Sequence, residues 1–122
     1  MVNKQDFFNA FNQNIDMVRG DNLAFNFQLK GLGSRSAYEA LAVTFAVAEH
    51  YDDVTIFECT VGDGVELEDY TDDTATYSVF VSPEKTKSLD LARYYYDLQI
   101  KDDVNVVTLM RGILTLVYDV AD

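Results

Sequence analysis

The stretch Asn22–Lys30, NLAFNFQLK, decides the fold class of this chain. Large apolar side chains occupy every second position of it: Leu23, Phe25, Phe27 and Leu29. The residues between them are small or polar. A period of two is typical of a β-strand that turns one face to the core and the other to water.

Similar patterns recur along the rest of the chain, at Ala40–Ala48, Val54–Val61, Thr74–Val81, Arg93–Lys101 and Asn105–Val120. In Thr74–Val81 we expect Ala75, Tyr77, Val79 and Val81 to face inward. In Arg93–Lys101, one face carries Tyr94, Tyr96, Leu98 and Ile100. Turn residues separate the segments at Gly31–Ser34, Asp52-Asp53, Val61–Asp63 and Asp102-Asp103. Roughly six or seven short strands with such turns predict an all-β fold, a β-sandwich with Greek-key connections.

Two details interrupt this pattern. Pro83 follows Ser82, an N-cap residue, so we expect a single helical turn there. Gly112 lies inside the last strand, where a glycine indicates a bulge or a close approach of another backbone segment.

The N-terminal segment has a different pattern. In Lys4–Asn14, the aromatic residues Phe7, Phe8 and Phe11 have helix-compatible spacing. Either a short amphipathic helix or an extended arm fits this spacing. We therefore divide the chain into an arm at residues 1–14 and a β-sandwich domain at residues 15–122. The arm either covers one end of the sandwich or inserts into a neighbouring subunit.

Composition excludes several classes of function. The 122 residues suffice for one domain, and 9 Lys and Arg against 21 Asp and Glu give a net charge of −12. Such a chain lacks the basic face of a nucleic-acid binder and is repelled by anionic membranes. One cysteine, Cys59, allows no internal disulfide. We find no secretory signal, and the longest apolar run, Ala40–Ala48, is about half a membrane span.

Catalytic patterns are weak. His50 and Cys59 are the one histidine and the one cysteine, but no glycine-rich elbow accompanies them, so we expect a loop histidine and a packed cysteine. Phosphate loops, dinucleotide fingerprints and zinc spacings are absent. Arg19-Gly20-Asp21 spells an integrin-binding tripeptide, yet a tight turn explains it. We predict that the chain is not an enzyme and carries no cofactor.

Carboxylates crowd the segment 63–73, as Asp63, Glu66, Glu68, Asp69, Asp72 and Asp73. Hard cations prefer such oxygen ligands, which leaves a calcium site open. The spacing matches no EF-hand loop, so we predict a solvated acidic face and no metal.

The sequence gives stronger evidence for interaction surfaces than for a catalytic or metal site. Outward positions of Ala40–Ala48 are small and nearly uncharged, and Tyr94, Tyr95 and Tyr96 place a tyrosine on each face of their strand. The last strand is apolar on both faces, as buried or partner-binding strands are. We predict a partner interface formed by Phe7, Phe8, Phe11, Leu114, Leu116, Tyr118 and Val120.

The order of these parts resembles a known family. Met17-Val18-Arg19-Gly20-Asp21 precedes the alternating strand Leu23–Leu29, and Val81-Ser82-Pro83-Glu84-Lys85-Thr86 follows a middle strand. Tyr94–Ile100, YYYDLQI, and Thr108–Leu116, TLMRGILTL, come last. Val18 to Val120 is similar to the small immunoglobulin-like domains of tailed-bacteriophage structural proteins, above all the N-terminal domain of the baseplate upper protein family. The family often has glycine where Ala92-Arg93 stand here.

The resemblance implies an immunoglobulin-like β-sandwich and a structural role in the virion, in the tail, baseplate or neck. Many relatives continue beyond this domain, so an ending at Asp122 favours a self-contained subunit. We expect a homo-oligomer, assembled in the bacterial host cytoplasm with other virion proteins and without nucleic acid or membrane. Three alternatives stay open. One is a capsid decoration or head-fibre attachment protein, and another is a small hydrolase. The third is a carbohydrate-binding module that uses exposed tyrosines, with or without calcium held by the carboxylates of segment 63–73.

Overall fold

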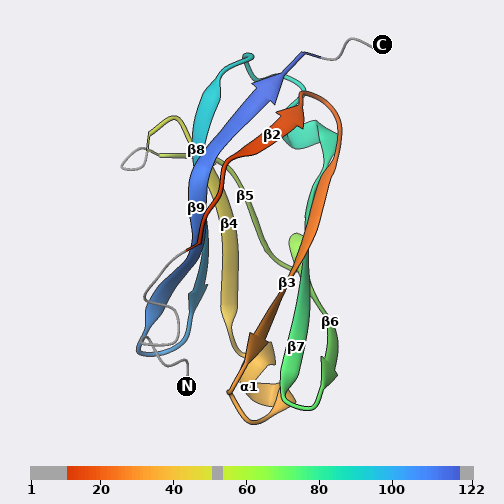
Figure 1. Ribbon diagram of the computed structural model, residues 1–122, viewed down its shortest axis with the longest axis vertical. Coiled ribbons are helices and arrows are strands. Elements are labelled where there is room, and N and C mark those ends of the chain that lie inside the picture. The colour runs from red at the N-terminus through yellow and green to blue at the C-terminus, as the bar shows by residue number, and fades with distance from the viewer. Residues whose placement is uncertain (1–10, 51–53, 119–122) are drawn as a thin grey trace.

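The computed structural model describes residues 11–50 and 54–118 (Figure 1). This part of the chain contains β1 (Phe11–Asn12), β2 (Ile15–Val18), β3 (Leu23–Lys30), α1 (Arg35–Glu39), β4 (Ala42–Ala48), β5 (Thr55–Val61), β6 (Gly64–Thr71), β7 (Thr74–Val81), the 3-10 helix η2 (Pro83–Lys85), β8 (Arg93–Lys101) and β9 (Val106–Val117). The predicted all-β fold is confirmed. Neither helix in these two ranges is long and apolar enough to cross a membrane.

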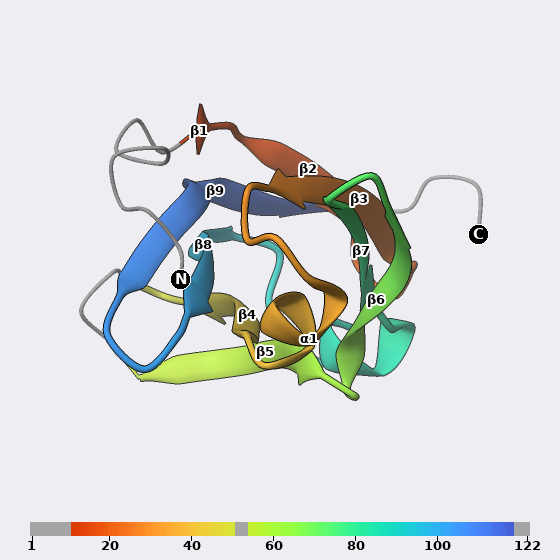
Figure 2. The ribbon, with the colours of Figure 1, turned by 90° about the horizontal axis from the view of Figure 1, so that it is seen from below.

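The strands form one sheet that closes almost into a barrel. Their order is β1-β9-β8-β4-β5-β6-β7-β3, and β2 also pairs with β9. Figure 2 shows the strands surrounding a common interior, with β3 returning toward β2 and β9. Within the described residues, no strand pairs with β3 on the side opposite β7. The barrel therefore has a seam between β3 and the strands β2 and β9.

A sharp corner bends the sheet where β5 meets β6. These consecutive strands run parallel, and only two register pairs join them, Thr60 with Gly64 and Val61 with Val65. The Thr60 amide donates to the Asp63 carbonyl at 3.0 Å, and the Asp63 amide donates back to Thr60 at 2.8 Å. The predicted turn at Val61–Asp63 is thus confirmed as the place where the sheet folds over.

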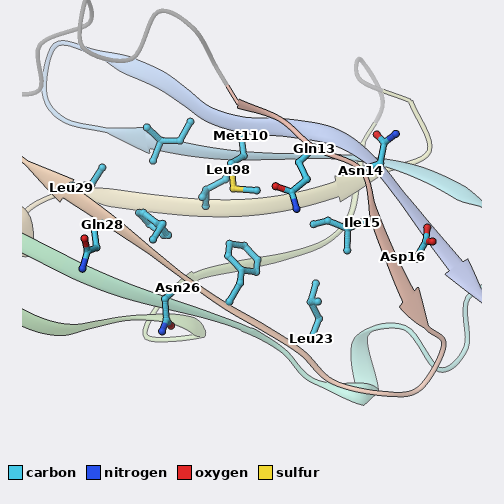
Figure 3. A pocket seen from close by; sticks show the side chains of 13 residues that line it. Gln13, Asn14, Ile15, Asp16, Leu23, Asn26, Gln28, Leu29, Leu98 and Met110 are labelled. Carbon is cyan, nitrogen blue, oxygen red and sulfur yellow. The ribbon is translucent and has the colours of Figure 1, made fainter.

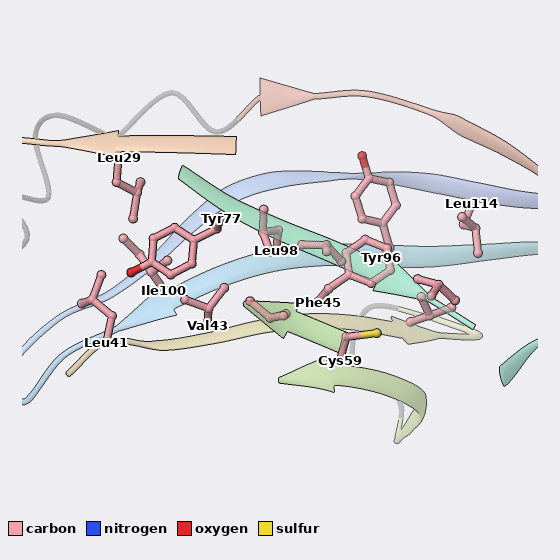
Figure 4. Packing of buried hydrophobic residues seen from close by; sticks show 14 of the residues in the cluster. Leu29, Leu41, Val43, Phe45, Cys59, Tyr77, Tyr96, Leu98, Ile100 and Leu114 are labelled. Carbon is pink, nitrogen blue, oxygen red and sulfur yellow. The ribbon is translucent and has the colours of Figure 1, made fainter. Parts of the chain in front are cut away.

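Alternating side chains from these strands fill the interior (Figure 4). The four predicted inward residues of Thr74–Val81 and the four of Arg93–Lys101 are all buried, at 5% exposure or less. At the centre, the Phe45 ring lies 5.4 Å from the Tyr96 ring, centroid to centroid. Full burial of one such apolar side chain contributes about 1.5–3 kcal/mol to folding. The alternation in the sequence therefore predicted correctly which side chains of β7 and β8 are buried in the core.

The Arg19-Gly20-Asp21 turn is confirmed and is tied to the loop that contains η2. Gly20 has a φ of +86°, and the Asp21 amide donates to the Val18 carbonyl at 3.0 Å. The Gly20 amide donates to the buried Thr86 hydroxyl oxygen at 3.1 Å. The Arg19 guanidinium donates to the Leu89 carbonyl at 3.1 Å. The tripeptide thus holds two loops of its own chain together.

Besides the short strand β2, two elements were not predicted. The acidic segment forms the strand β6, in which Val65 is buried and Leu67 half-buried between exposed glutamates. Asp72 and Asp73 turn the chain into β7 with φ values of 52° and 55°, as a two-residue hairpin requires. The alternation was present in the sequence, but the density of carboxylates concealed it.

The other unpredicted element, α1, lies across the lower end of the barrel in Figure 1. Ser34 caps it by accepting a hydrogen bond from the Ala37 amide at 3.3 Å. Its Tyr38 side chain is buried and closes this end of the core. Because the chain leaves α1 at Ala40, the next strand starts at Ala42, two residues later than predicted.

The helical turn expected after Ser82 is confirmed as η2, although the Ser82 side chain makes no capping hydrogen bond. A helix reaching Asn14 is wrong for the described end of the arm, because Phe11 and Asn12 form the strand β1. The rest of the arm, residues 1–10, and the predicted turn at residues 52–53 lie outside the described residues.

Candidate functional site

The seam of the barrel is an apolar groove with a volume of about 680 Å³ (Figure 3). That size falls within the range of about 300–1,000 Å³ typical of ligand pockets. Its lining residues come from the chain before β2 and from β2, β3, β8 and β9: Gln13, Asn14, Ile15, Asp16, Leu23, Phe25, Asn26, Phe27, Gln28, Leu29, Leu98, Leu109 and Met110. We call this surface the seam groove.

One wall of the groove is formed by apolar side chains of β3, which pack against aromatic residues of the core. Leu23, Phe25 and Phe27 are half-buried although they face inward, because none of the described strands covers them on the seam side. The Phe25 ring packs edge-on against Phe45 at 5.6 Å. The Phe27 ring stacks on Tyr77 at 5.1 Å and 7°. These aromatic contacts hold the side chains of Phe25 and Phe27 against the core.

The opposite wall is the chain before β2, which is bound tightly to β9. The Gln13 amide donates to the Arg111 carbonyl at 3.0 Å, and the Ile113 amide donates to the Asn14 side chain at 3.1 Å. A side chain at Gly112 would collide with the Gln13 carbonyl. The close backbone approach predicted at Gly112 is therefore confirmed, while the register irregularity of this pair of strands lies near Leu98 instead.

The chemistry of the seam groove favours binding. Within residues 11–50 and 54–118, Asp16 is the one charged residue that lines the groove. The Gln28 amide donates to the Thr76 hydroxyl oxygen at 3.2 Å. Leu98 and Met110 lie on the floor of the groove in Figure 3, and Leu109 also lines it. An apolar floor between two strands is suited to an extended peptide with apolar side chains.

A second cleft, of about 310 Å³, is polar and lies on the outer face of β4, β5 and β8. It is lined by Thr44, Ala46, Ala48, Thr55, Glu58, Tyr95, Tyr96, Asp97 and Gln99. The small residues of β4, noted in the sequence, form its floor. Burial raises the pKa of Asp97, and the nearby Arg111 guanidinium opposes that rise. We call this surface the polar trough.

Of the residues predicted as a partner interface, the structure describes the side chains of Leu114, Leu116 and Tyr118. Leu114 and Leu116 are buried in the core of this chain, at 0% and 2% exposure. Tyr118 is 68% exposed beyond the end of β9. The backbone of Phe11 pairs with Met110 in β9. Phe7, Phe8 and Val120 lie outside the described residues.

The candidate catalytic pair is not assembled. Cys59 is fully buried in β5, where its thiol lies 3.5 Å from the Phe80 carbonyl oxygen. Burial raises the pKa of this thiol. His50 is exposed, and its ring lies 6.1 Å from the Tyr95 ring. The prediction of a packed cysteine is confirmed.

The carboxylates of segment 63–73 point to solvent, with the half-buried Asp73 as the exception. Asp73 accepts hydrogen bonds from the Gly33 amide at 2.8 Å, the Tyr38 hydroxyl at 3.0 Å and the Gly31 amide at 3.1 Å. Its function is thus to bind the loop before α1. Among residues 11–50 and 54–118, no three His, Cys, Asp or Glu side chains are grouped to hold a metal ion.

Sequence reasoning missed the seam groove. It identified Leu23, Phe25 and Phe27 as inward-facing but gave no sign that the sheet stays open beside them. The alternation of a strand reports which side chains share a face, not whether a neighbour pairs with its edge. A comparison with protein-family models finds no match for this chain, and a comparison with curated proteins finds none either.

Proposed function

We propose that this chain is a non-enzymatic structural subunit of a tailed-bacteriophage particle, in the tail, baseplate or neck, that binds further copies through the seam groove. The groove is the observation that carries this proposal. It joins an apolar floor to an open strand edge, and exposed edges of this kind are sites of strand addition between chains.

We propose further that the fold is an immunoglobulin-like sandwich. The two-pair junction of β5 and β6 divides the sheet into one group with β9, β8, β4 and β5 and another with β6, β7 and β3. This is the order of strands in immunoglobulin variable-type domains, with β2 beside the last strand. The Tyr94 hydroxyl, at the start of β8, donates to the Asp90 carbonyl at 2.9 Å. That bond has the form of the tyrosine corner of such domains.

The proposed place in the tail, baseplate or neck of a phage particle rests on the sequence resemblance from Val18 to Val120. The net charge of −12 is consistent with a subunit that stays soluble before it assembles. A capsid decoration or head-fibre attachment protein with the same fold remains the alternative within this class.

The test is the mass of the purified chain in solution, measured by light scattering across a concentration series. A defined oligomer, unchanged by a chelator, supports a self-assembling subunit. Negative-stain electron microscopy of the same sample then shows whether the oligomers are rings or open arrays. A monomer at every concentration contradicts assembly through the seam groove.

A carbohydrate-binding module is the second candidate, because of the polar trough. Hydroxyl-rich ligands suit its lining of Tyr95, Asp97, Gln99 and Glu58. The calcium-dependent form has no support among the described residues, where no carboxylate group is arranged for a metal. Glycan-array binding that is lost in Asp97→Ala and kept in Asp69→Ala, an exposed carboxylate of β6, would favour this candidate.

A further inference from the structure

We infer that the polar trough binds an arginine side chain of a basic partner chain, with the guanidinium above Ala46 between Glu58 and Asp97. The described residues that line the trough are all different from those that line the seam groove, so this contact is separate from the proposed self-assembly. Four observations lead to the inference: the register of three strands, the hydrogen-bonding groups of the trough, the environment of Asp97 and the charge of the whole chain.

The register of the strands places two carboxylates on either side of a small floor. Ala46 in β4 lies directly opposite Glu58 in β5 and directly opposite Asp97 in β8. Residues that lie opposite each other in neighbouring strands point to the same face of the sheet. Because neighbouring strands are about 4.8 Å apart, the two acidic positions are about 10 Å apart, with a single methyl group between them. A gap of this shape admits a planar group from solvent.

The trough continues along the strands on both sides of this gap. In the rows before and after it, Ala48 lies opposite Tyr95 and Thr44 lies opposite Gln99. The four residue steps from Tyr95 to Gln99 span about 14 Å along β8. A segment of polypeptide fills that length, and the Tyr95 ring offers an apolar surface to the stem of an arginine. A free small cation would leave both ends of the trough empty.

The hydrogen-bonding groups of the trough call for a ligand that brings donors. The carboxylates of Glu58 and Asp97 accept hydrogen bonds only, and the Gln99 side-chain amide already donates to Asp97 at 3.5 Å and to Thr108 at 3.4 Å. A guanidinium carries five N–H donors in one plane, so it can bond to two carboxylates at once. A lysine ammonium is a compact charge and suits a gap of this width less well.

The charge of Asp97 is only partly compensated by its own chain. The side chain is half-buried, and the hydrogen bond that it accepts from Gln99 is long. Burial raises the pKa of Asp97, and the attraction of Arg111 opposes this rise without reversing it. Arg111 lies opposite Asp97 in β9, on the side away from Ala46. A second cation above Ala46 would therefore stabilise this carboxylate from the side of the trough.

The charge of the whole chain favours a basic partner over a second copy. With 9 Lys and Arg against 21 Asp and Glu, the net charge is −12. Two such chains repel each other, whereas a basic chain is attracted and associates faster at low ionic strength. Charge complementarity thus identifies the partner as a protein segment that presents an arginine on a basic surface.

Titration of the full-length chain with short peptides tests the inference. The probe is acetyl-Ala-Arg-Ala-amide, followed by NMR at the backbone amides of Ala46, Asp97 and Gln99. We expect saturable shifts of these amides, and none with a peptide that carries citrulline, which keeps the shape of arginine without its charge. A lysine peptide should bind about threefold more weakly. No binding of the arginine peptide, or equal binding of the arginine and lysine peptides, overturns the inference.

Substitutions with a matched control locate the site. Asp97→Asn should weaken binding of the arginine peptide about tenfold, and Glu58→Gln, at an exposed residue, about threefold. Glu66→Gln removes the same charge from an exposed position of β6, outside the trough, and should leave the affinity unchanged. Ala46→Leu fills the gap without a change of charge and should abolish binding. Because the exposed Glu58 is not needed for folding, equal affinities for Glu58→Gln and Glu66→Gln overturn the inference.

Three further outcomes assign the trough to another occupant, and each overturns the inference. Saturable binding of methyl α-mannoside that depends on Asp97, without binding of the arginine peptide, assigns the trough to a carbohydrate. Argininamide that binds as tightly as the peptide assigns it to a free small cation. A lower oligomer mass in light scattering for Glu58→Gln, with Glu66→Gln unchanged, assigns it to a second copy of this chain.

Discussion

The Tyr96 hydroxyl in β8 donates a hydrogen bond to the carbonyl oxygen of Gln13, 83 residues earlier in the chain. The Gln13 amide is bonded to the Arg111 carbonyl, so this residue is held on both sides. Through these bonds, the core of the domain fixes one wall of the seam groove. The position of the groove therefore depends on side chains far from it in sequence.

Removal of the Tyr96 hydroxyl should weaken the attachment of Gln13 to the core. We expect Tyr96→Phe to lower the free energy of unfolding by about 0.5–1.5 kcal/mol, because the Gln13 carbonyl loses its donor. Tyr118→Phe, at a 68% exposed tyrosine, should change it by less than about 0.5 kcal/mol. Urea denaturation of both variants measures the difference, and equal values would refute the importance of this bond.

Gly112→Ala should displace the same wall by a different route. The new Cβ would overlap the Gln13 carbonyl, so the chain before β2 must move away from β9. We expect the Gln13 amide to exchange with solvent faster, while amides in β7 keep their protection. Hydrogen exchange followed by NMR measures both. Unchanged protection of the Gln13 amide would show that β9 moves to make room for the Cβ, and not the chain before β2.

Gly64 and Gly62 form a matched pair at the corner between β5 and β6. Both have positive φ, at +99° and +89°, so alanine is strained at either position. A Cβ at Gly64 would also lie 2.8 Å from the Phe80 carbonyl and 2.9 Å from Cys59, whereas one at Gly62 meets nothing. We expect Gly64→Ala to destabilise the fold by about 1–3 kcal/mol more than Gly62→Ala. Equal losses in thermal unfolding would argue against crowding.

Asp73 should make stability depend on pH. The Gly33 amide, followed by the Tyr38 hydroxyl and the Gly31 amide, lowers the pKa of this carboxyl. Because the folded-state pKa lies below the unfolded value of about 3.9, the stabilisation is fully present above that value. It is lost as the pH falls through the lower folded-state pKa.

Asp73→Asn should therefore lower the thermal midpoint at neutral pH, and the difference from the wild type should shrink in acid. Asp72→Asn is the control, because Asp72 has a similarly positive φ, 52° against 55° for Asp73, and is exposed. Asparagine tolerates this conformation, so the turn itself is preserved. A deficit for Asp73→Asn that stays constant down to about pH 2 would contradict this origin of the effect.

Cys59 should resist alkylation in the folded chain. Burial raises the pKa of its thiol and blocks access to it, so little thiolate is exposed near pH 8. We expect iodoacetamide to label the native chain far more slowly than the chain in urea, as followed by mass spectrometry. Rapid labelling of native protein would mean that β5 opens readily.

The sequence by itself determined which side chains face the interior. The alternation in β3, β7 and β8 needs only the geometry of an extended chain, in which successive side chains point to opposite faces. The turn at Gly20 and the close approach at Gly112 followed in the same way, because glycine is required where φ is positive or where a Cβ has no room.

Only the tertiary structure decided where the sheet ends. Whether β3 pairs with β2 or stays apart depends on the bend at β5 and β6 and on the attachment of Gln13 to β9, and both involve residues distant in sequence. The burial of Leu114 and Leu116, which the sequence left open to a partner, was settled by the same packing. Strand pairing is a non-local interaction, so no local pattern specifies it, and the seam groove exists only because one such pairing is absent among the described strands.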